Sequence, residues 1–220
     1  LAVGFVRQAE TTLKRIAPVV VGITGSYGKT STKGYVAHLL AARFSVVASP
    51  KSFNNRAGLA RTVNEHLVAG TDGLVAEMGT YGPGEIAAIC AWLPPKIAVI
   101  TAIGPVHLER FGSLENTLSA KAEIVESAET VVLNVDDERL AGLASVLEDR
   151  GKVVIRCSAC DVGADVALVD DSGGLGWYSK NRRLATLDPT APALGAARTN
   201  VAAAIGVASA LGCPDEEIRA

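Results

Sequence analysis

The stretch Val19-Val20-Val21-Gly22-Ile23-Thr24-Gly25-Ser26-Tyr27-Gly28-Lys29-Thr30 runs from a β-branched segment through a glycine-rich turn into a helix candidate. Its apolar residues 19–24 predict a buried strand, and residues 30–43 predict a helix. Glycines allow backbone amides to approach anionic oxygens, and a helix N-terminus adds the positive end of a dipole. The stretch therefore predicts a polyphosphate-binding loop. The less specific interpretation is a turn that only connects a strand to a helix.

The spacing of this loop departs from the ordinary G-x-x-x-x-G-K-[ST] pattern, which needs glycine where this chain has Ile23. Gly22 lies one residue further upstream. In such loops the lysine contacts the β- and γ-phosphates of a nucleoside triphosphate, and the hydroxyl after it ligates magnesium. We therefore expect Lys29 and Thr30 in these roles. The loop residues expected around the nucleotide are Gly25, Ser26, Tyr27, Gly28, Lys29, Thr30 and Ser31.

Short β-branched runs alternate with helix candidates along the chain. Further strands are expected at 45–48, 74–78, 97–103, 130–135 and 152–156, and further helices at 56–68, 84–92, 114–127, 137–147 and 201–211. Such apolar runs suit strands that are covered on both faces. The expected fold class is therefore α/β, with a mainly parallel P-loop-type sheet flanked by helices. Short runs at 166–169, 176–179 and 183–187 predict a small antiparallel meander near the C-terminal end.

The composition limits the classes of partner. The chain has 220 residues, of which 49% are hydrophobic, which is enough for a substantial buried core. The formal net charge of −2 gives no reason to expect nucleic acid or an anionic membrane as a partner, because both require a basic patch. No apolar run approaches the ~18 residues of a membrane span. Membrane association is expected only if a segment outside this sequence provides it.

The four cysteines are too few for a disulfide scaffold. Cys157 and Cys160 have no second pair that would complete a zinc site. We interpret them as ordinary thiols near a strand end, with a metal or redox role as the alternative. This use of cysteine favours a reducing, cytoplasmic compartment.

Five segments, in order along the chain, carry a family resemblance. The loop from Gly22 to Thr32 resembles the phosphate loop of the Mur ligases and the folylpolyglutamate synthases. Phe53-Asn54-Asn55-Arg56-Ala57-Gly58 is similar to the family's Asn-Asn-x-x-Gly segment, and residues 77–86 resemble the segment with a metal-binding glutamate. Residues 101–113 resemble the histidine motif, which is followed here by Ala120-Lys121-Ala122-Glu123-Ile124. The resemblance extends from about residue 19 to residue 211.

Within the family, Gly82-Pro83-Gly84-Glu85-Ile86 and residues 107–113 are most like the member that adds D-alanyl-D-alanine to the UDP-muramoyl-tripeptide. The resemblance implies that residues 19–212 form the central ATP-binding domain of a three-domain ligase. Residues 1–18 are then a linker or helical lead-in, and residues 213–220 begin a linker to a further, C-terminal domain. Both ends of the sequence resemble cut ends, so we interpret the chain as a fragment.

The resemblance also assigns roles to single residues. It makes Glu77 a magnesium ligand, although a strand-end glutamate can also be an exposed acid. It makes His107 the ligand of a second metal near an acyl phosphate, although a lone histidine is more often packed or solvated. Lys121 is implied to be carbamylated and to orient a metal, whereas the sequence alone suggests a solvent-facing helix lysine. Asn55 falls in the implied substrate-binding set.

Two asparagines complete the implied nucleotide site. Asn134 resembles a family asparagine near the nucleotide, and Asn200 matches one that reaches the adenine. Either residue can instead cap a helix or form a turn. The chain departs from the family at Thr199, where histidine is common, and at Ala203, where a second asparagine is common.

The function that follows from the resemblance is an ATP-dependent, ADP-forming amide ligase that uses magnesium. The expected substrates are a muramoyl-peptide-like acyl donor and an amino acid or dipeptide, in peptidoglycan precursor synthesis. We expect the segment alone to bind ATP without making amides. Three alternatives stay open: a folylpolyglutamate synthase-like ligase, a nucleotide-binding module without ligase activity, and a P-loop kinase, which the loop spacing disfavours.

Overall fold

The computed structural model describes residues 2–51, 53–187 and 197–219. Its strands form a single mixed sheet in the order β2-β3-β1-β4-β5-β6-β7-β8-β9, parallel from β2 to β7 and antiparallel from β7 to β9. This arrangement confirms the predicted fold class, including the antiparallel meander. The strands are β1 (Val19–Thr24), β2 (Val46–Ala48), β3 (Gly73–Glu77), β4 (Ile97–Ile100), β5 (Thr130–Asn134), β6 (Val153–Ser158), β7 (Val166–Asp171), β8 (Gly174–Ser179) and β9 (Arg182–Thr186).

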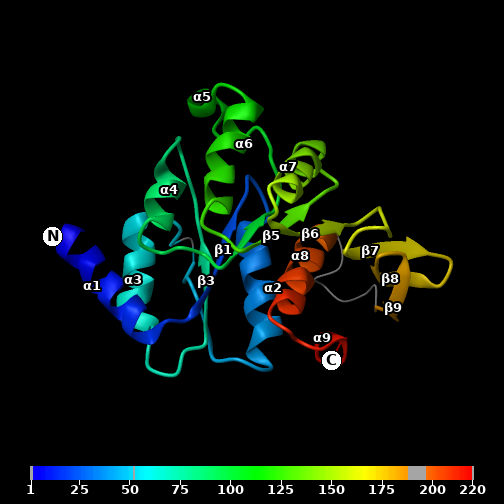
Figure 1. The fold of residues 1–220 in the computed structure, drawn as a ribbon, viewed down its shortest axis with the longest axis horizontal. Helices are drawn as coiled ribbons and strands as arrows, with labels where there is room; N and C mark the ends of the chain where they lie inside the picture. Colours follow the sequence, from blue (N-terminus) through cyan, green and yellow to red (C-terminus); the bar gives the residue numbers. More distant parts are fainter. Residues whose placement is uncertain (1, 52, 188–196, 220) are drawn as a thin grey trace.

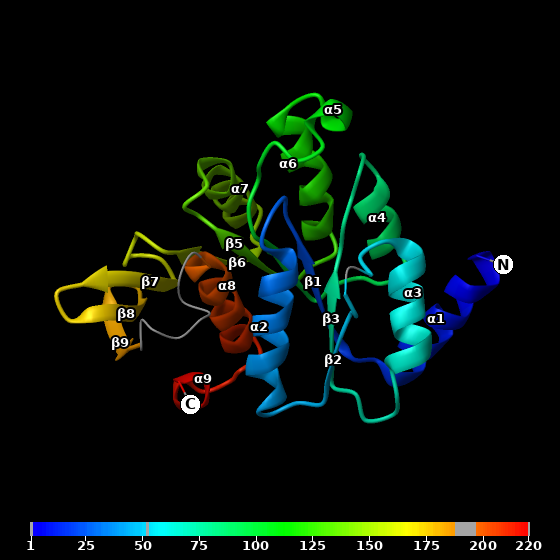
Figure 2. The same cartoon turned by 180° about the vertical axis from the view of Figure 1, so that it is seen from behind.

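Helices cover both faces of the sheet (Figure 1). Helices α2 and α8 pack against each other on one face, and α3, α4, α6 and α7 lie on the other. Helix α1 packs on the outside of α3, at the opposite end of the molecule from β7, β8 and β9 (Figures 1 and 2). The helices are α1 (Ala2–Ile16), α2 (Lys29–Ala41), α3 (Arg56–His66), α4 (Glu85–Cys90), α5 (Leu108–Phe111), α6 (Leu114–Ala122), η1 (Glu123–Val125), α7 (Glu138–Asp149), α8 (Arg198–Ala210) and α9 (Asp215–Arg219).

Alternate residues of the central strands enter two separate cores. Val20 and Ala98 pack with α1, α3 and α4, whereas their neighbours Val21 and Val99 pack with α2 and α8. All four side chains are at most 5% exposed. Because successive strand residues point to opposite faces, a strand that is covered on both sides needs an unbroken apolar run. This requirement explains why the sequence shows continuous rather than alternating hydrophobic segments.

Three elements differ from the sequence-based expectation. Strand β4 ends at Ile100, although the apolar run continues to Ile103, because Thr101 and the residues after it turn toward the loop that follows β1. Helix α5 was not predicted. Helix α9 lies in the segment that was expected to begin a linker, where Pro214 and an acidic first turn favour a helix start. The domain limits stay predictions, and residues 188–196 of the proposed central domain lie outside the described part.

The order of the strands creates a crevice at the carboxyl edge of the sheet. Strands β2 and β3 lie on one side of β1, and β4 and β5 lie on the other. Connections that leave β1 and β4 therefore diverge at this edge, which is where ligands bind in open α/β sheets. The glycine-rich loop follows β1 there, Glu77 ends β3, and the segment 101–107 follows β4.

No helix within residues 2–51, 53–187 and 197–219 is long and apolar enough to cross a membrane.

Candidate functional site

The glycine-rich loop is held in place by the segment that follows β4. The Ser26 hydroxyl donates to the Gly104 carbonyl at 3.1 Å and accepts from the Gly104 amide at 2.9 Å. Gly25 adopts φ 146°, and a Cβ at this position would collide with the Thr101 hydroxyl. Gly28 adopts φ 79° and caps α2, so that the helix begins at Lys29. The loop therefore requires glycine for backbone conformation at both positions and for close approach at Gly25.

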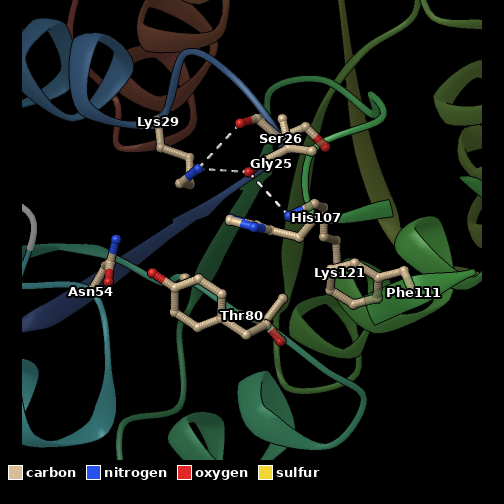
Figure 3. A pocket seen from close by; sticks show the side chains of 11 residues that line it. Gly25, Ser26, Lys29, Asn54, Thr80, His107, Phe111 and Lys121 are labelled. Atoms are coloured by element: carbon tan, nitrogen blue, oxygen red, sulfur yellow. Dashed lines mark hydrogen bonds between the residues drawn. The ribbon is translucent and has the colours of Figure 1, made fainter. Parts of the chain in front are cut away.

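Two lysines converge on one carbonyl of this loop (Figure 3). Lys29 Nζ donates to the Gly25 oxygen at 2.8 Å, and Lys121 Nζ donates to the same oxygen at 3.1 Å. Burial lowers the pKa of Lys29, and the negative charge of Glu77 partly opposes this effect. Burial, together with the positive charge of Lys29, lowers the pKa of Lys121 to about 8. Positive charge at the two lysines would favour an anion bound beside the Gly25 carbonyl.

The burial of Lys121 excludes one interpretation of the sequence. Its side chain is 5% exposed, so it is not a solvent-facing helix lysine. Its side chain reaches from α6 to the glycine-rich loop, where Figure 3 shows its hydrogen bond to Gly25. Lys121 is thus part of the cavity at the carboxyl edge.

Glu77 is the centre of a buried polar cluster. The residue is 2% exposed, which excludes the alternative of an exposed strand-end acid. Thr30 Oγ1 donates to Oε2 at 2.8 Å, and Lys33 Nζ contacts the same oxygen at 3.3 Å. Asn54 Nδ2 donates to the other oxygen, Oε1, at 3.1 Å. The hydroxyl of Thr30 and the carboxylate of Glu77 are hard oxygen donors, so this pair fits the chemistry of a magnesium ion.

His107 lines the same cavity as Lys29 and Lys121 (Figure 3). It has φ 57°, a left-handed conformation that is uncommon outside glycine, and it begins the short helix α5. Its side chain is 40% exposed, and its ring meets the edge of Tyr81 with centroids 4.9 Å apart. His107 is therefore a partly exposed side chain that lines the cavity together with Lys29 and Lys121.

The predicted asparagines have different surroundings. Asn200, in the first turn of α8, lies against Gly28, where a Cβ would come within 2.5 Å of its Oδ1. Asn134 is 9% exposed and cross-links two loops, since its Nδ2 donates to the Thr101 carbonyl at 3.1 Å and its Oδ1 accepts from the Asp136 amide. Asn55 is exposed and caps α3, with its side chain accepting from Gly58 N. Asn55 therefore lies outside the cavity lining.

The other predicted residues lie at the surface of the loop. Tyr27 is 54% exposed, with its ring over Gly104, and Ser31 is exposed in the first turn of α2.

The two cysteines that the sequence analysis singled out differ in exposure. Cys157 is buried and Cys160 is exposed, and the pKa of both thiols is raised. Burial is the main cause for Cys157, and a hydrogen bond with Asp136 is the main cause for Cys160.

Sequence reasoning missed several residues of this site. Lys33 follows Thr30 by three positions, a spacing that puts both on one helix face and could have identified it. Asn54 precedes the residue that the sequence analysis selected, and it is Asn54 that contacts Glu77. Thr80, Tyr81 and Phe111 also line the cavity. They lie within the segments 77–86 and 101–113 that carry the resemblance, but no role was predicted for these three residues.

The lowered pKa of Lys121 leads to a prediction about stability. The unfolded chain has the ordinary pKa of 10.5, whereas the folded value is about 8. Between these values the unfolded state binds more protons, so the free energy of unfolding should rise with pH across this window. The expected rise is on the order of 3 kcal/mol, at about 1.36 kcal/mol per pKa unit. Urea unfolding in CO₂-free buffer at several pH values in this window measures it.

A matched pair of variants isolates the contribution of this lysine. Lys121→Met should lose the rise, while Lys96→Met, which removes an exposed lysine, should keep it. Equal pH dependence in the wild-type protein and in Lys121→Met would contradict the assignment of the shift to Lys121.

The chain resembles known proteins in both sequence and fold. Residues 23–208 match the family model of the Mur ligase middle domain. The UDP-N-acetylmuramoyl-tripeptide–D-alanyl-D-alanine ligase of Mycobacterium leprae is 44% identical over 142 residues, which are 63% of this chain and 27% of that protein. The structure of the MurF ligase from Thermotoga maritima in complex with ADP has a TM-score of 0.81 at 26% identity, covering 100% of this chain and 52% of that one.

A more distant structure shares the fold alone. Escherichia coli FolC in complex with DHPP and ADP has a TM-score of 0.66 at 18% identity, covering 98% of this chain and 59% of that one. The aligned part of this chain spans less than a third of the length of the Mycobacterium leprae relative. Because the family model covers most of the described residues, the chain belongs to the Mur ligase family and contains its middle domain.

Proposed function

We propose that this chain is the ATP-binding part of an ADP-forming amide ligase that activates a carboxylate as an acyl phosphate. The observation that carries the proposal is the convergence of Lys29 and Lys121 on the Gly25 carbonyl, with the Thr30–Glu77 pair beside them. The Lys29 ammonium and the N-terminus of the helix after the glycine-rich loop provide the positive charge that a polyphosphate requires, and Lys121 reaches the same loop carbonyl from α6. The solved MurF ligase with ADP supports the same interpretation.

In the proposed reaction Lys29 moves from the Gly25 carbonyl to the β- and γ-phosphates. The backbone amides of residues 25–30 and the nearby Asn200 hold the rest of the nucleotide, and Asn134 fixes the adjoining loop. A carboxylate oxygen of the acyl donor attacks the γ-phosphorus, and the bond to the β–γ bridging oxygen breaks to leave ADP. The amine then attacks the acyl carbon, loses a proton, and phosphate leaves.

Thr30 and Glu77 are the proposed ligands of one magnesium ion. His107 and carbamylated Lys121 are the proposed ligands of a second. Bound magnesium neutralises the charge that develops on the transferred phosphoryl group. Carbamylation begins from the neutral amine of Lys121. Its nitrogen bonds to the carbon of CO₂, one C=O electron pair moves to oxygen, and one N–H proton is released to solvent. The lowered pKa of Lys121 favours this step, because a larger fraction of the amine is neutral near pH 8.

The proposed substrates are a UDP-muramoyl-tripeptide and D-alanyl-D-alanine, in cytoplasmic peptidoglycan precursor synthesis. The name of the Mycobacterium leprae relative supports this pair, and all the cysteines, which are free thiols, suit a reducing compartment. Asn55, at the N-cap of α3, is proposed to contact the acyl donor rather than the nucleotide.

A folylpolyglutamate synthase-like activity is the second candidate, supported only by a fold-level likeness. Assays of the complete protein with a muramoyl tripeptide plus D-alanyl-D-alanine, and with a folate plus glutamate, separate the two.

The nucleotide assignment predicts the behaviour of Lys29→Ala. The 220-residue chain should bind ATP in the presence of magnesium, and Lys29→Ala should weaken this binding by about 10-fold or more, since it removes a charge-assisted contact with phosphate. Isothermal titration calorimetry measures both affinities. The chain should form no amide from the two substrates, because it spans only part of the length of its relatives.

The matched control is Lys51→Ala, which removes an exposed lysine near the same cluster and should leave the affinity unchanged. Undetectable heat with wild-type protein at millimolar ATP and magnesium would refute the nucleotide assignment. Equal affinity in wild type and Lys29→Ala would refute the role of the lysine.

A further inference from the structure

Lys33 is a buried cation that the proposed reaction does not use. Its side chain is 7% exposed, and its Nζ lies 3.3 Å from Glu77 Oε2. The same nitrogen donates to the carbonyl of Lys51 at 2.5 Å, so the ammonium is anchored from a second side. A charge this deeply buried needs polar partners, which the carboxylate of Glu77 and the carbonyl of Lys51 provide.

The charges around Glu77 do not favour a free cation. Within the described residues, the cavity lining contains Lys29 and Lys121 but no carboxylate, and Glu77 is already paired with Lys33. The charge of Glu77 is therefore compensated before any metal arrives. Both of its oxygens already have polar contacts, because Thr30 and Lys33 contact Oε2 and Asn54 donates to Oε1. A divalent cation would have to compete with an ammonium for the same oxygen.

A bound polyphosphate reverses this balance. Its negative charges would lie next to Lys29 and the loop amides, and its oxygens would supply the ligands that magnesium prefers. Attraction between the metal and the phosphates can then offset the repulsion from Lys33, which acts at short range in a buried environment.

We infer that Lys33 makes metal binding at Glu77 conditional on the nucleotide, so that the divalent cation enters with the phosphates and not before them. This inference rests on the proposed role of Glu77 as a magnesium ligand. Lys33 is a positioning residue: it acts through Glu77 and holds Oε2 while the loop is free of nucleotide.

The test measures Mn²⁺ binding to the 220-residue chain by the loss of the free-ion electron paramagnetic resonance signal, with and without ADP, after subtraction of the loss that ADP alone causes without protein. Wild-type protein should bind Mn²⁺ with ADP and show little binding without it. Lys33→Met should bind Mn²⁺ without ADP at least 10-fold more tightly than wild type, because the carboxylate loses its paired cation. Mn²⁺ alone should also raise the melting temperature of Lys33→Met, but not that of wild type.

Two further variants identify the cause. Lys51→Met removes an exposed lysine whose carbonyl, not side chain, contacts Lys33, and it should behave as wild type. Lys33→Met combined with Glu77→Gln should lose the Mn²⁺ binding seen without ADP, which would locate it at this carboxylate.

Three results would each contradict a different part of this inference. If neither wild type nor any variant binds Mn²⁺ in the presence of ADP, the proposed nucleotide and metal site is wrong. If wild type binds Mn²⁺ equally well with and without ADP, the nucleotide requirement is overturned, and this result needs no variant to fold. If Lys33→Met is folded by circular dichroism and binds free Mn²⁺ no better than wild type, Lys33 is not the cause.

Discussion

In the complete protein that contains this segment, Lys121→Ala is expected to lower kcat by about 10²–10³-fold, the range typical for removal of one preorganised electrostatic group. Lys121 is buried, and its Nζ lies 3.1 Å from the carbonyl that Lys29 also contacts. An unmodified cation here would repel the metal that the proposed reaction needs. A carbamate instead provides an oxygen ligand of the kind magnesium prefers. Steady-state assays of ADP release measure the loss.

Chemical rescue tests whether the missing group is an anion. A short-chain carboxylic acid should restore part of the activity of Lys121→Ala, because it can enter the space that the side chain leaves. Lys121→Arg should stay inactive with or without the acid, since the guanidinium keeps its positive charge and cannot be carbamylated. The matched control is Lys96→Ala, which removes an exposed lysine and should retain full activity.

Each outcome decides between specific alternatives. Full activity in Lys121→Ala would refute a catalytic role and leave Lys121 as a structural lysine of α6 that contacts the loop. Loss of activity without rescue by any short carboxylic acid would contradict the carbamate, provided that the variant retains the wild-type affinity for ADP.

The sequence predicts the central sheet well because the signal for each strand is local. Continuous apolar runs such as 19–24 and 130–134 are required by strands with helices on both faces, and no distant contact is needed to recognise them. The phosphate loop is predictable for the same reason, since its glycines and Lys29 are adjacent in the chain. Its geometry follows from backbone rules that apply to any such loop.

The rest of the site depends on contacts between distant segments. Lys121 and Gly25 are 96 residues apart, so nothing in the helix pattern around Lys121 indicates that it is buried. The end of β4 is likewise decided by the hydrogen bonds of Thr101 to Thr24 and Tyr27, which lie more than 70 residues away. Helix α5 has only four residues and follows His107 in a left-handed conformation, so it is too short for a periodic pattern.

Gly25→Ala is expected to have the second largest effect, and it tests the geometry of the loop rather than a charge. Gly25 has φ 146°, a region that side chains with a Cβ rarely adopt, and the added Cβ would meet the Thr101 hydroxyl. Backbone strain of this kind costs about 1–3 kcal/mol, and the collision adds to it. The Gly25 carbonyl would also shift, which would displace both lysines that donate to it.

Two measurements on Gly25→Ala, with a glycine of the adjoining helix as control, decide whether the loop needs glycine at this point. Urea unfolding should show a loss of about 2 kcal/mol or more, and calorimetry should show ATP binding weakened by about 100-fold, because the phosphate cradle is distorted. Gly34, in the interior of α2, has open space around its Cβ position, so Gly34→Ala should stabilise the protein by up to about 1 kcal/mol and leave ATP binding unchanged. If Gly25→Ala matches Gly34→Ala in both measurements, the loop tolerates a side chain at this position, and the rigid cradle on which the proposed nucleotide site depends does not exist.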